Sequence, residues 1–471
     1  MTPNPKRGEH AAPPDPSGPT RLRFRPRPAA GRPRHARPRS RPRPPAWPRS
    51  RRALATAGLG TLALTGVTAL ALTSAAPAFA GPAPAVRAPR GQLLSVTPLR
   101  TMSTAAVQAE LTADGFDPSA ARYGVRSFRL VYRTVDAFGR PITASGLMVL
   151  PGSGARRLSV VSFDHGTESY RGDAPSMSPT GFEPAPAYTF ASAGFAVSDP
   201  DYLGLGRGPG RQPYMDVPSE TTATLDMLRA VRHYLTGHGV TARRAVLATG
   251  FSQGASGALG LGRALQRGAD PWFRLGALAP ISGAYDMTHA EATAIADGDL
   301  VRLNPDKQLG AKYTVLYAAM VLVGLNRVHP FYTSPSQVFR RPYASTIETL
   351  LDGNHTGQQL FNGTPAQLGD LLTPRGFALL RHPTGNFATA LAIDSSVCDW
   401  TPRVPTRLYF ATGDEQAVTA NTGHCQAAFA AHGARVPAVN LGAPDNQGSR
   451  HYGSNAAGTA QIVRWFSRLA H

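Results

Sequence analysis

Short apolar runs alternate with amphipathic, helix-length segments along most of the chain. Two early runs rich in β-branched and aromatic residues flank the turn Phe138-Gly139-Arg140-Pro141 and predict a hairpin. The later alternation predicts a mainly parallel sheet with helices on both faces and the hairpin as its antiparallel edge. The predicted strands are Ser127–Thr134, Ile142–Leu150, Ser159–Phe163, Phe195–Ser198, Ala245–Thr249, Leu275–Pro280, Arg407–Ala411 and Val436–Leu441. The predicted helices are Thr104–Ala113, Ala187–Ala193, Ser219–Leu235, Ser252–Gln266, Ala420–Ala431 and Thr459–Ala470.

This alternation is interrupted between about residues 284 and 401. The interrupting stretch contains Tyr313–Asn326, a run without a charged residue, among several Pro, Asn and Gly turns. Such an insertion predicts a helical cap over the carboxyl ends of the strands. Tyr313–Asn326 is alternatively a core helix, and both interpretations hold if the cap has a core of its own.

The positive charge of the chain is concentrated near its beginning. The 471 residues carry a formal net charge of +20, and residues 1–80 contain 15 Lys and Arg against 2 Asp and Glu, a net charge of +13. The remaining residues therefore carry only +20 − 13 = +7. Because the excess of basic residues lies outside the predicted fold, we expect no nucleic-acid partner.

Residues 1–80 have the composition of a leader followed by an export signal. Residues 1–50 are rich in Arg and Pro and predict a disordered leader, or a translated upstream region. Residues 51–80 begin with Arg51-Arg52, continue as an uncharged apolar run and end in Ala78-Phe79-Ala80. This order predicts a cleaved signal peptide that resembles the twin-arginine type, and hence a secreted protein. An uncleaved membrane anchor is the alternative, because the run is long enough to span a bilayer.

The chain has two cysteines, Cys398 and Cys425. In an exported protein an even number of cysteines predicts a disulfide, and two separate buried thiols are the alternative. A metal site would require more ligands of this kind nearby, so no metal is predicted.

The run Gly250-Phe251-Ser252-Gln253-Gly254 has the G-x-S-x-G pattern of a nucleophile turn. In a chain with 48 glycines the pattern alone is weak, and its context carries the inference. The apolar strand Ala245–Thr249 precedes it, and a helix rich in small residues follows, which permits close packing on the sheet. We therefore predict that Ser252 is a nucleophile. A glycine-rich turn without catalytic function is the alternative.

A serine hydroxyl needs a base that accepts its proton, and the base needs an orienting carboxylate. Asp414 follows the late strand Arg407–Ala411 and is the predicted acid, with Glu415 as the alternative. His451 lies between the last predicted strand and the last predicted helix, where a loop can return to Ser252, and is the predicted base. The other histidines after Asp414 are the helix-associated His424 and His432 and the terminal His471.

Hydrolysis also requires donors for the oxyanion that forms in the transition state. The backbone N–H of Gln253, the residue after the nucleophile, is the first predicted donor. The second is predicted in the loop after strand Ser159–Phe163, at Thr167 or at Gly166. His165 in the same loop is interpreted as a structural histidine.

Several segments, in order, resemble the secretory lipase family of α/β-hydrolases, which includes Candida-type lipase A and actinobacterial exported lipases. The segments that carry the resemblance are Asp164-His165-Gly166-Thr167, Ala174-Pro175-Ser176, Asp199–Gly206, Pro213-Tyr214, Gly250–Gly254, Thr412-Gly413-Asp414-Glu415 and His451. The resemblance implies that residues 81–471 form one α/β-hydrolase domain with the cap inserted at about 284–401. It also implies a Ser252–Asp414–His451 triad that hydrolyses carboxylic esters of apolar acids.

The sequence thus favours a secreted lipase or carboxylesterase that requires no cofactor. We expect a monomer that acts on a small-molecule or lipid ester and touches membranes only through its export signal or a lipid interface. A secreted serine peptidase that releases short amino-terminal peptides with the same triad is the alternative. A carboxylate cluster in the cap would favour it, and the cap contains Glu291, Asp297, Asp299, Asp306, Glu348 and Asp352. A non-catalytic binding protein on a hydrolase scaffold is a third hypothesis.

Overall fold

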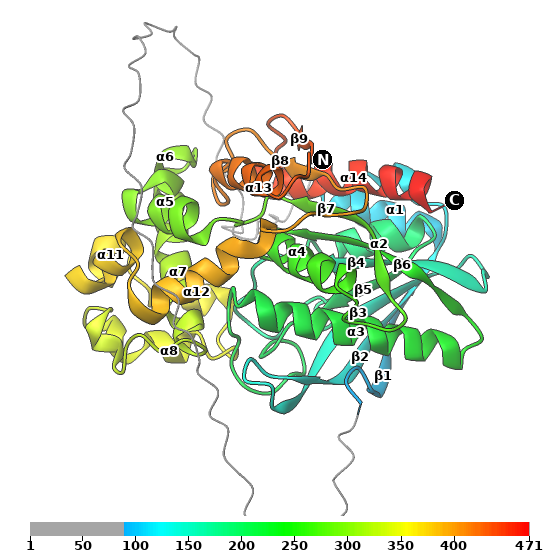
Figure 1. Ribbon diagram of the computed structural model, residues 1–471, viewed down its shortest axis with the longest axis horizontal. Coiled ribbons are helices and arrows are strands. Elements are labelled where there is room, and N and C mark those ends of the chain that lie inside the picture. Colours follow the sequence, from blue (N-terminus) through cyan, green and yellow to red (C-terminus); the bar gives the residue numbers. More distant parts are fainter. Residues whose placement is uncertain (1–88, 471) are drawn as a thin grey trace, which may run out of the picture. The chain divides into compact units, whose positions relative to one another are not determined.

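A nine-stranded sheet runs through the computed structural model, which describes residues 89–470 (Figure 1). The predicted leader (1–50) and export signal (51–80) lie outside the described residues. The spatial order of the strands is β1-β2-β3-β5-β4-β6-β7-β8-β9. The strands are β1 (Leu93–Met102), β2 (Val125–Val135), β3 (Pro141–Pro151), β4 (Arg157–Asp164), β5 (Ala196–Pro200), β6 (Thr241–Phe251), β7 (Arg274–Ile281), β8 (Leu408–Phe410) and β9 (Ala438–Asn440).

The sheet is antiparallel at one edge and parallel elsewhere. β1 to β3 pair antiparallel with their neighbours, β3 pairs antiparallel with β5, and every later pair is parallel. The predicted α/β-hydrolase fold class is therefore confirmed. The sequence interpretation missed β1, an edge strand that contains Pro98 and two irregularities in its pairing. Proline is tolerated at an edge, where its missing N–H does not interrupt a ladder.

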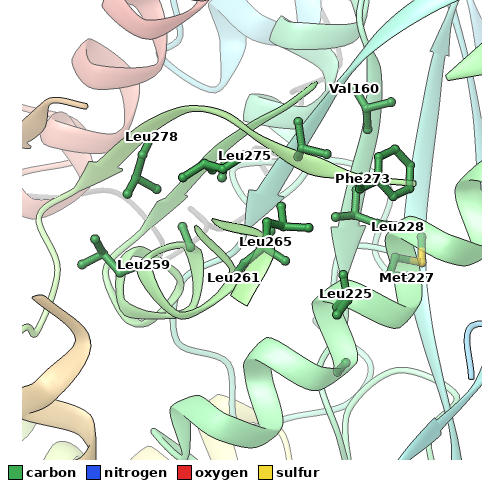
Figure 2. Packing of buried hydrophobic residues seen from close by; sticks show 14 of the residues in the cluster. Val160, Leu225, Met227, Leu228, Leu259, Leu261, Leu265, Phe273, Leu275 and Leu278 are labelled. Carbon is green, nitrogen blue, oxygen red and sulfur yellow. The ribbon is translucent and has the colours of Figure 1, made fainter. Parts of the chain in front are cut away.

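Helices cover both faces of the sheet. On one face, α3 (Val217–Gly237) and α4 (Gln253–Gln266) pack their leucines against the central strands, as Figure 2 shows for Leu225, Leu228, Leu259 and Leu265. On the other face, α1 (Thr104–Ala113), α2 (Ala185–Ser192) and α14 (Arg450–Leu469) build a second core. Because both faces are covered, the central strands are apolar on both sides, as in β4 and β6.

A group of helices is inserted between β7 and β8, with a core of its own. Its longest member, α7 (Lys307–Asn326), contains the uncharged run Tyr313–Asn326. Among the described residues, α7 is the one helix long and apolar enough to span a membrane, but it is largely buried inside the cap. Figure 1 shows these helices, green to orange, grouped beside one end of the sheet. Besides α7 they are the single π turn η2 (Met287–Glu291), α5 (Ala292–Asp297), α6 (Asp299–Leu303), α8 (Ile347–Leu350), α9 (Gly357–Gly363), α10 (Leu368–Leu371), α11 (Pro374–Arg381) and α12 (Gly385–Ser395).

The predicted disulfide joins Cys398, just after α12, to Cys425 on α13 (Ala420–Ala431). Both cysteines are fully buried. The bond therefore ties the end of the cap to the helix that follows Asp414.

Candidate active site

The strand-to-helix turn after β6 places Ser252 in a strained backbone conformation. Its φ is 56° and its ψ −120°, and α4 begins at the next residue. The two flanking glycines are required by close approach, because a Cβ at Gly254 would overlap the carbonyl oxygen of Asp164, and one at Gly250 would overlap that of Gly254. The N–H of Ser252 donates to the carbonyl oxygen of Ile281 on β7, 3.0 Å away. Backbone strain of this kind persists where surrounding structure enforces it, and it is common at active sites.

The turn directs Ser252 to a histidine and an aspartate. Nε2 of His451 lies 2.9 Å from Oγ of Ser252, and Nδ1 of His451 lies 2.9 Å from each carboxylate oxygen of Asp414. Oδ1 of Asp414 also accepts the N–H groups of Gln416 and Ala417, at 3.0 and 2.9 Å. The carboxylate is thereby held toward the ring. The structure thus brings the three residues predicted from the sequence into one chain of hydrogen bonds.

The position of His451 differs from the loop expected from the sequence. Helix α14 begins at Arg450, so His451 lies in its first turn. Ser449 caps this helix by accepting the N–H of Tyr452. A helix holds the imidazole more firmly than a loop, because its backbone is fixed by the capped first turn.

Glu415, the alternative acid, has a different position. Its carboxylate accepts the hydroxyl of Ser449 and the N–H groups of Arg450 (3.2 Å) and His451 (3.4 Å). It therefore stabilises the amino terminus of α14, where a negative charge is favourable, and contacts the backbone of His451 instead of its ring. Of the remaining histidines, His424 pairs with Asp286 and His432 bonds a carbonyl oxygen of α13.

The two predicted oxyanion donors come from the turn after β6 and the loop after β4. The N–H of Gln253 is the first of helix α4 and has no partner within that helix. Thr167 lies three residues after the end of β4, and its Oγ1 is 3.0 Å from the hydroxyl of Tyr214. The sequence interpretation assigned Tyr214 no function beyond its place in the resemblance. An added Cβ at Gly166 would lie 3.1 Å from the ring of Phe251, so this loop packs closely on the nucleophile turn.

His165 in the same loop is buried and held by structural contacts. Its ring stacks on Tyr202 with centroids 4.4 Å apart, and its Nδ1 lies 2.7 Å from the carbonyl oxygen of Gly166. Burial lowers the pKa of His165 to about 4, so the ring is neutral at pH 7. These contacts agree with the structural interpretation of His165.

No protein-family model matches the chain, and no curated protein matches it. Among solved structures it is similar to the rice cell wall degrading esterase LipA from Xanthomonas oryzae, with a TM-score of 0.69 and 25% identity, over 81% of this chain and 99% of that one. It is also similar to a protein from Legionella pneumophila (TM-score 0.68, 20% identity, 80% and 98% covered). A third similar structure is Candida antarctica lipase A (TM-score 0.55, 17% identity, 75% and 76% covered).

The chain has a lipase-A-like α/β-hydrolase fold. The resemblance inferred from its sequence segments is thereby confirmed. In this hydrolase, the segment inserted between β7 and β8 contributes half of the residues that line a small cavity at Ser252. The cavity measures about 30 Å³, taken as the space open to the centre of a water-sized sphere. It is lined by Tyr214, Met215, Ser252, Gln253, Ala284, Met287, Glu291, Ile295, Tyr317, Val321, Gln416 and Ala417.

The lining of this cavity is mostly apolar, and several of its polar groups are already paired. The hydroxyl of Tyr317 donates to Oε1 of Gln416 at 2.5 Å. Oε1 of Glu291 accepts the side-chain amide of Asn421 and the N–H of Val418. Burial raises the pKa of Glu291 to about 8, so this carboxyl is neutral at pH 7 and the cavity carries no charge from it.

Two further observations within the described residues 89–470 point away from a second site. A larger hollow of about 840 Å³ beside Arg90, Arg232 and Phe273 contains none of the residues predicted to be catalytic. Within residues 89–470, no group of three or more His, Cys, Asp and Glu side chains is arranged to hold a metal ion. The cavity at Ser252 is therefore the candidate active site.

Proposed function

We propose that this protein is an exported serine hydrolase that cleaves carboxylic esters with short acyl chains. The class of enzyme, a carboxylic ester hydrolase, is confirmed by its similarity to an esterase of Xanthomonas oryzae and a lipase of Candida antarctica. The observation that carries the finer proposal is the hydrogen-bonded chain from Ser252 through His451 to Asp414 at a strand-to-helix turn.

In the proposed mechanism, Oγ of Ser252 attacks the ester carbonyl while Nε2 of His451 accepts its proton. Asp414 orients the imidazole and stabilises its charged form. The N–H groups of Gln253 and Thr167 bind the oxyanion of the tetrahedral intermediate. His451 then donates the proton to the departing alkoxide oxygen, which releases the alcohol and leaves an acyl group on Ser252. Water, deprotonated by His451, hydrolyses this acyl-enzyme and releases the acid.

The small cavity supports a short acyl chain. Apolar side chains of the cap, among them Met287, Ile295 and Val321, close the space next to Ser252. At about 30 Å³, the space open to the centre of a water-sized sphere is far smaller here than the roughly 840 Å³ of the hollow beside Arg90. We therefore expect short acyl chains to fit without movement of the cap.

Export is supported by the order of charged, apolar and small residues over 51–80. The disulfide between Cys398 and Cys425 agrees with it, because such bonds persist in oxidising compartments. Expression of the full chain in a secreting host, followed by amino-terminal sequencing of the medium fraction, tests this part. An amino terminus at or near residue 81 is expected, and retention of the whole chain in the membrane would contradict it.

The catalytic part is tested with a fluorophosphonate probe and two parallel substrate panels. We expect the probe to label wild type, and we expect wild type to hydrolyse p-nitrophenyl acetate and butyrate. Ser252→Ala should abolish both the labelling and the hydrolysis. Ser256→Ala is the matched control, because Ser256 lies one turn further along α4 and its hydroxyl bonds the carbonyl oxygen of Ala284. Labelling that persists in Ser252→Ala, or cleavage of aminoacyl anilides in place of esters, would overturn the proposal.

A further inference from the structure

The residue after the nucleophile is anchored by its side chain. Gln253 is 1% exposed, and its Nε2 donates to Oε1 of Glu220 at 2.6 Å. Glu220 lies in the first turn of α3 and is itself buried. The peptide that supplies the first proposed oxyanion donor is therefore tied to a carboxyl group on a neighbouring helix.

The second oxygen of Glu220 lies beside Gly257 of α4. Its Oε2 is buried and has no hydrogen-bond partner within residues 89–470. A Cβ added at Gly257 would lie 3.6 Å from this oxygen and 3.0 Å from Oδ2 of Asp164, so both oxygens border the same space beside α4. Asp164 ends β4 and begins the loop that carries Thr167. Glu220 thus bonds one of the segments that supply the proposed donors and lies near the start of the other.

The surroundings of Glu220 favour its neutral form. Burial, followed by the charge of Asp216, raises the pKa of Glu220 to about 8. Burial and the charge of Glu220 likewise hold the pKa of Asp164 well above its usual range. A neutral carboxyl keeps one oxygen as an acceptor for Gln253 and can donate through the other. The titratable groups that interact with Glu220 are Asp164, Asp216, Asp394, Tyr202 and Tyr214.

We propose that Glu220 is a positioning residue that holds both oxyanion donors, accepting from Gln253 through Oε1 and donating toward Asp164 through Oε2. This inference rests on the proposed function, since it assigns a task within the Ser252 site. Its effect should be confined to the transition state, because the donors bind charge that develops only there.

The first test compares Glu220→Ala with Glu220→Gln, using short p-nitrophenyl esters. Loss of a whole oxyanion donor lowers kcat by about 10²–10³. A displaced donor should cost less, so we expect Glu220→Ala to lower kcat by at least about tenfold with KM changed less than about twofold. Glutamine can accept from Gln253 and donate toward Asp164, so Glu220→Gln should recover most of the lost kcat.

The second test is the pH dependence of kcat. Glu220 loses its proton as the pH rises through its raised pKa of about 8, which removes the Oε2 donor and places a charge beside Asp164. Wild-type kcat should therefore fall on the alkaline side with a midpoint near this value, and Glu220→Gln should lack this fall. Asp394→Asn is the matched control. Asp394 is a buried carboxyl of the same cluster that bonds Val217 and makes no hydrogen bond to either donor segment, so its variant should keep the alkaline fall.

The outcomes separate this inference from the proposed function. If wild type neither hydrolyses esters nor reacts with the fluorophosphonate, the proposed function fails. If wild type is active but Glu220→Ala keeps the wild-type kcat, or Glu220→Gln keeps the alkaline fall, the function stands and the positioning role is wrong. Should Glu220→Ala fold poorly, the pH profile of Glu220→Gln decides alone.

Discussion

The length of the acyl chain that this hydrolase accepts should depend on Ile295. This side chain lies on α5, is 3% exposed and lines the cavity next to Ser252. Replacing isoleucine by alanine removes three carbon atoms and leaves a space that surrounding residues fill only in part. Because the space adjoins the cavity, we expect Ile295→Ala to admit an acyl chain longer by about two or three methylenes.

The magnitude follows from the free energy of burying a methylene. Each buried methylene contributes about 0.8 kcal/mol, so three contribute about 2.4 kcal/mol, or about 50-fold in kcat/KM. Wild type should prefer esters of short acids such as acetate and butyrate and lose activity steeply with longer acyl chains, because the cavity is small. The variant should gain up to about 50-fold on hexanoate or heptanoate relative to butyrate.

The assay is kcat/KM on p-nitrophenyl esters of increasing acyl length, below the concentration at which they aggregate. Ile462→Ala is the control, because Ile462 is equally buried but lies on α14 in the core on the other face of the sheet. It should lower stability by about 2–5 kcal/mol and leave the chain-length profile unchanged. If Ile295→Ala ranks the esters as wild type does, the cavity beneath the cap does not hold the acyl chain.

Three further perturbations test other parts of the structure. Replacing both Cys398 and Cys425 by alanine opens a loop with a sequence separation of 27 residues, which should lower the free energy of unfolding by about 3.5 kcal/mol. Calorimetry should show a lower Tm that reductant no longer changes. Asp414→Asn should lower kcat by about 10⁴-fold with little change in KM, because the amide favours the wrong imidazole tautomer. Steady-state kinetics at saturating ester measures this, and a loss of kcat below about tenfold would contradict the role of Asp414. Glu291 has a folded-state pKa of about 8 against an ordinary value of 4.5, so its contribution to stability is fully present below 4.5 and is lost as the pH rises through 8. Urea unfolding across this range should show a flatter pH dependence for Glu291→Gln.

Most elements of the fold could be predicted because their apolar pattern has a clear period. The buried strand β4 and the amphipathic helix α3 are examples in which pattern and structure agree within a few residues. The start of α14 could not be placed this way, because Arg450–Gly458 contains residues with weak helix propensity. Tertiary packing compensates for it, since Gly458 lies so close to Ile281 that a Cβ there would be 3.0 Å from that side chain.

The three residues of the proposed triad were accessible to sequence reasoning because each follows a strand or precedes a helix in a fixed chain order. Carboxyl ends of parallel strands meet at one edge of a sheet, so Ser252 and Asp414 had to lie near each other. Glu220 gave no such signal. An acidic residue in the first turn of an amphipathic helix is ordinarily a solvated charge that favours the helix dipole, and its burial is visible only when α4 packs on α3.

The first part of the cap both covers the cavity and supports the loop that holds Asp414 of the proposed triad. Tyr317 bonds Gln416 and Glu291 bonds the N–H of Val418, while the N–H groups of Gln416 and Ala417 hold Asp414. A movement that lifted η2 and α7 would break the bonds of Tyr317 and Glu291 and remove their support from the loop that holds the carboxylate. Substrate range should therefore change through side chains that line the cavity, such as Ile295, while a displacement of these two segments should lower kcat for every ester alike.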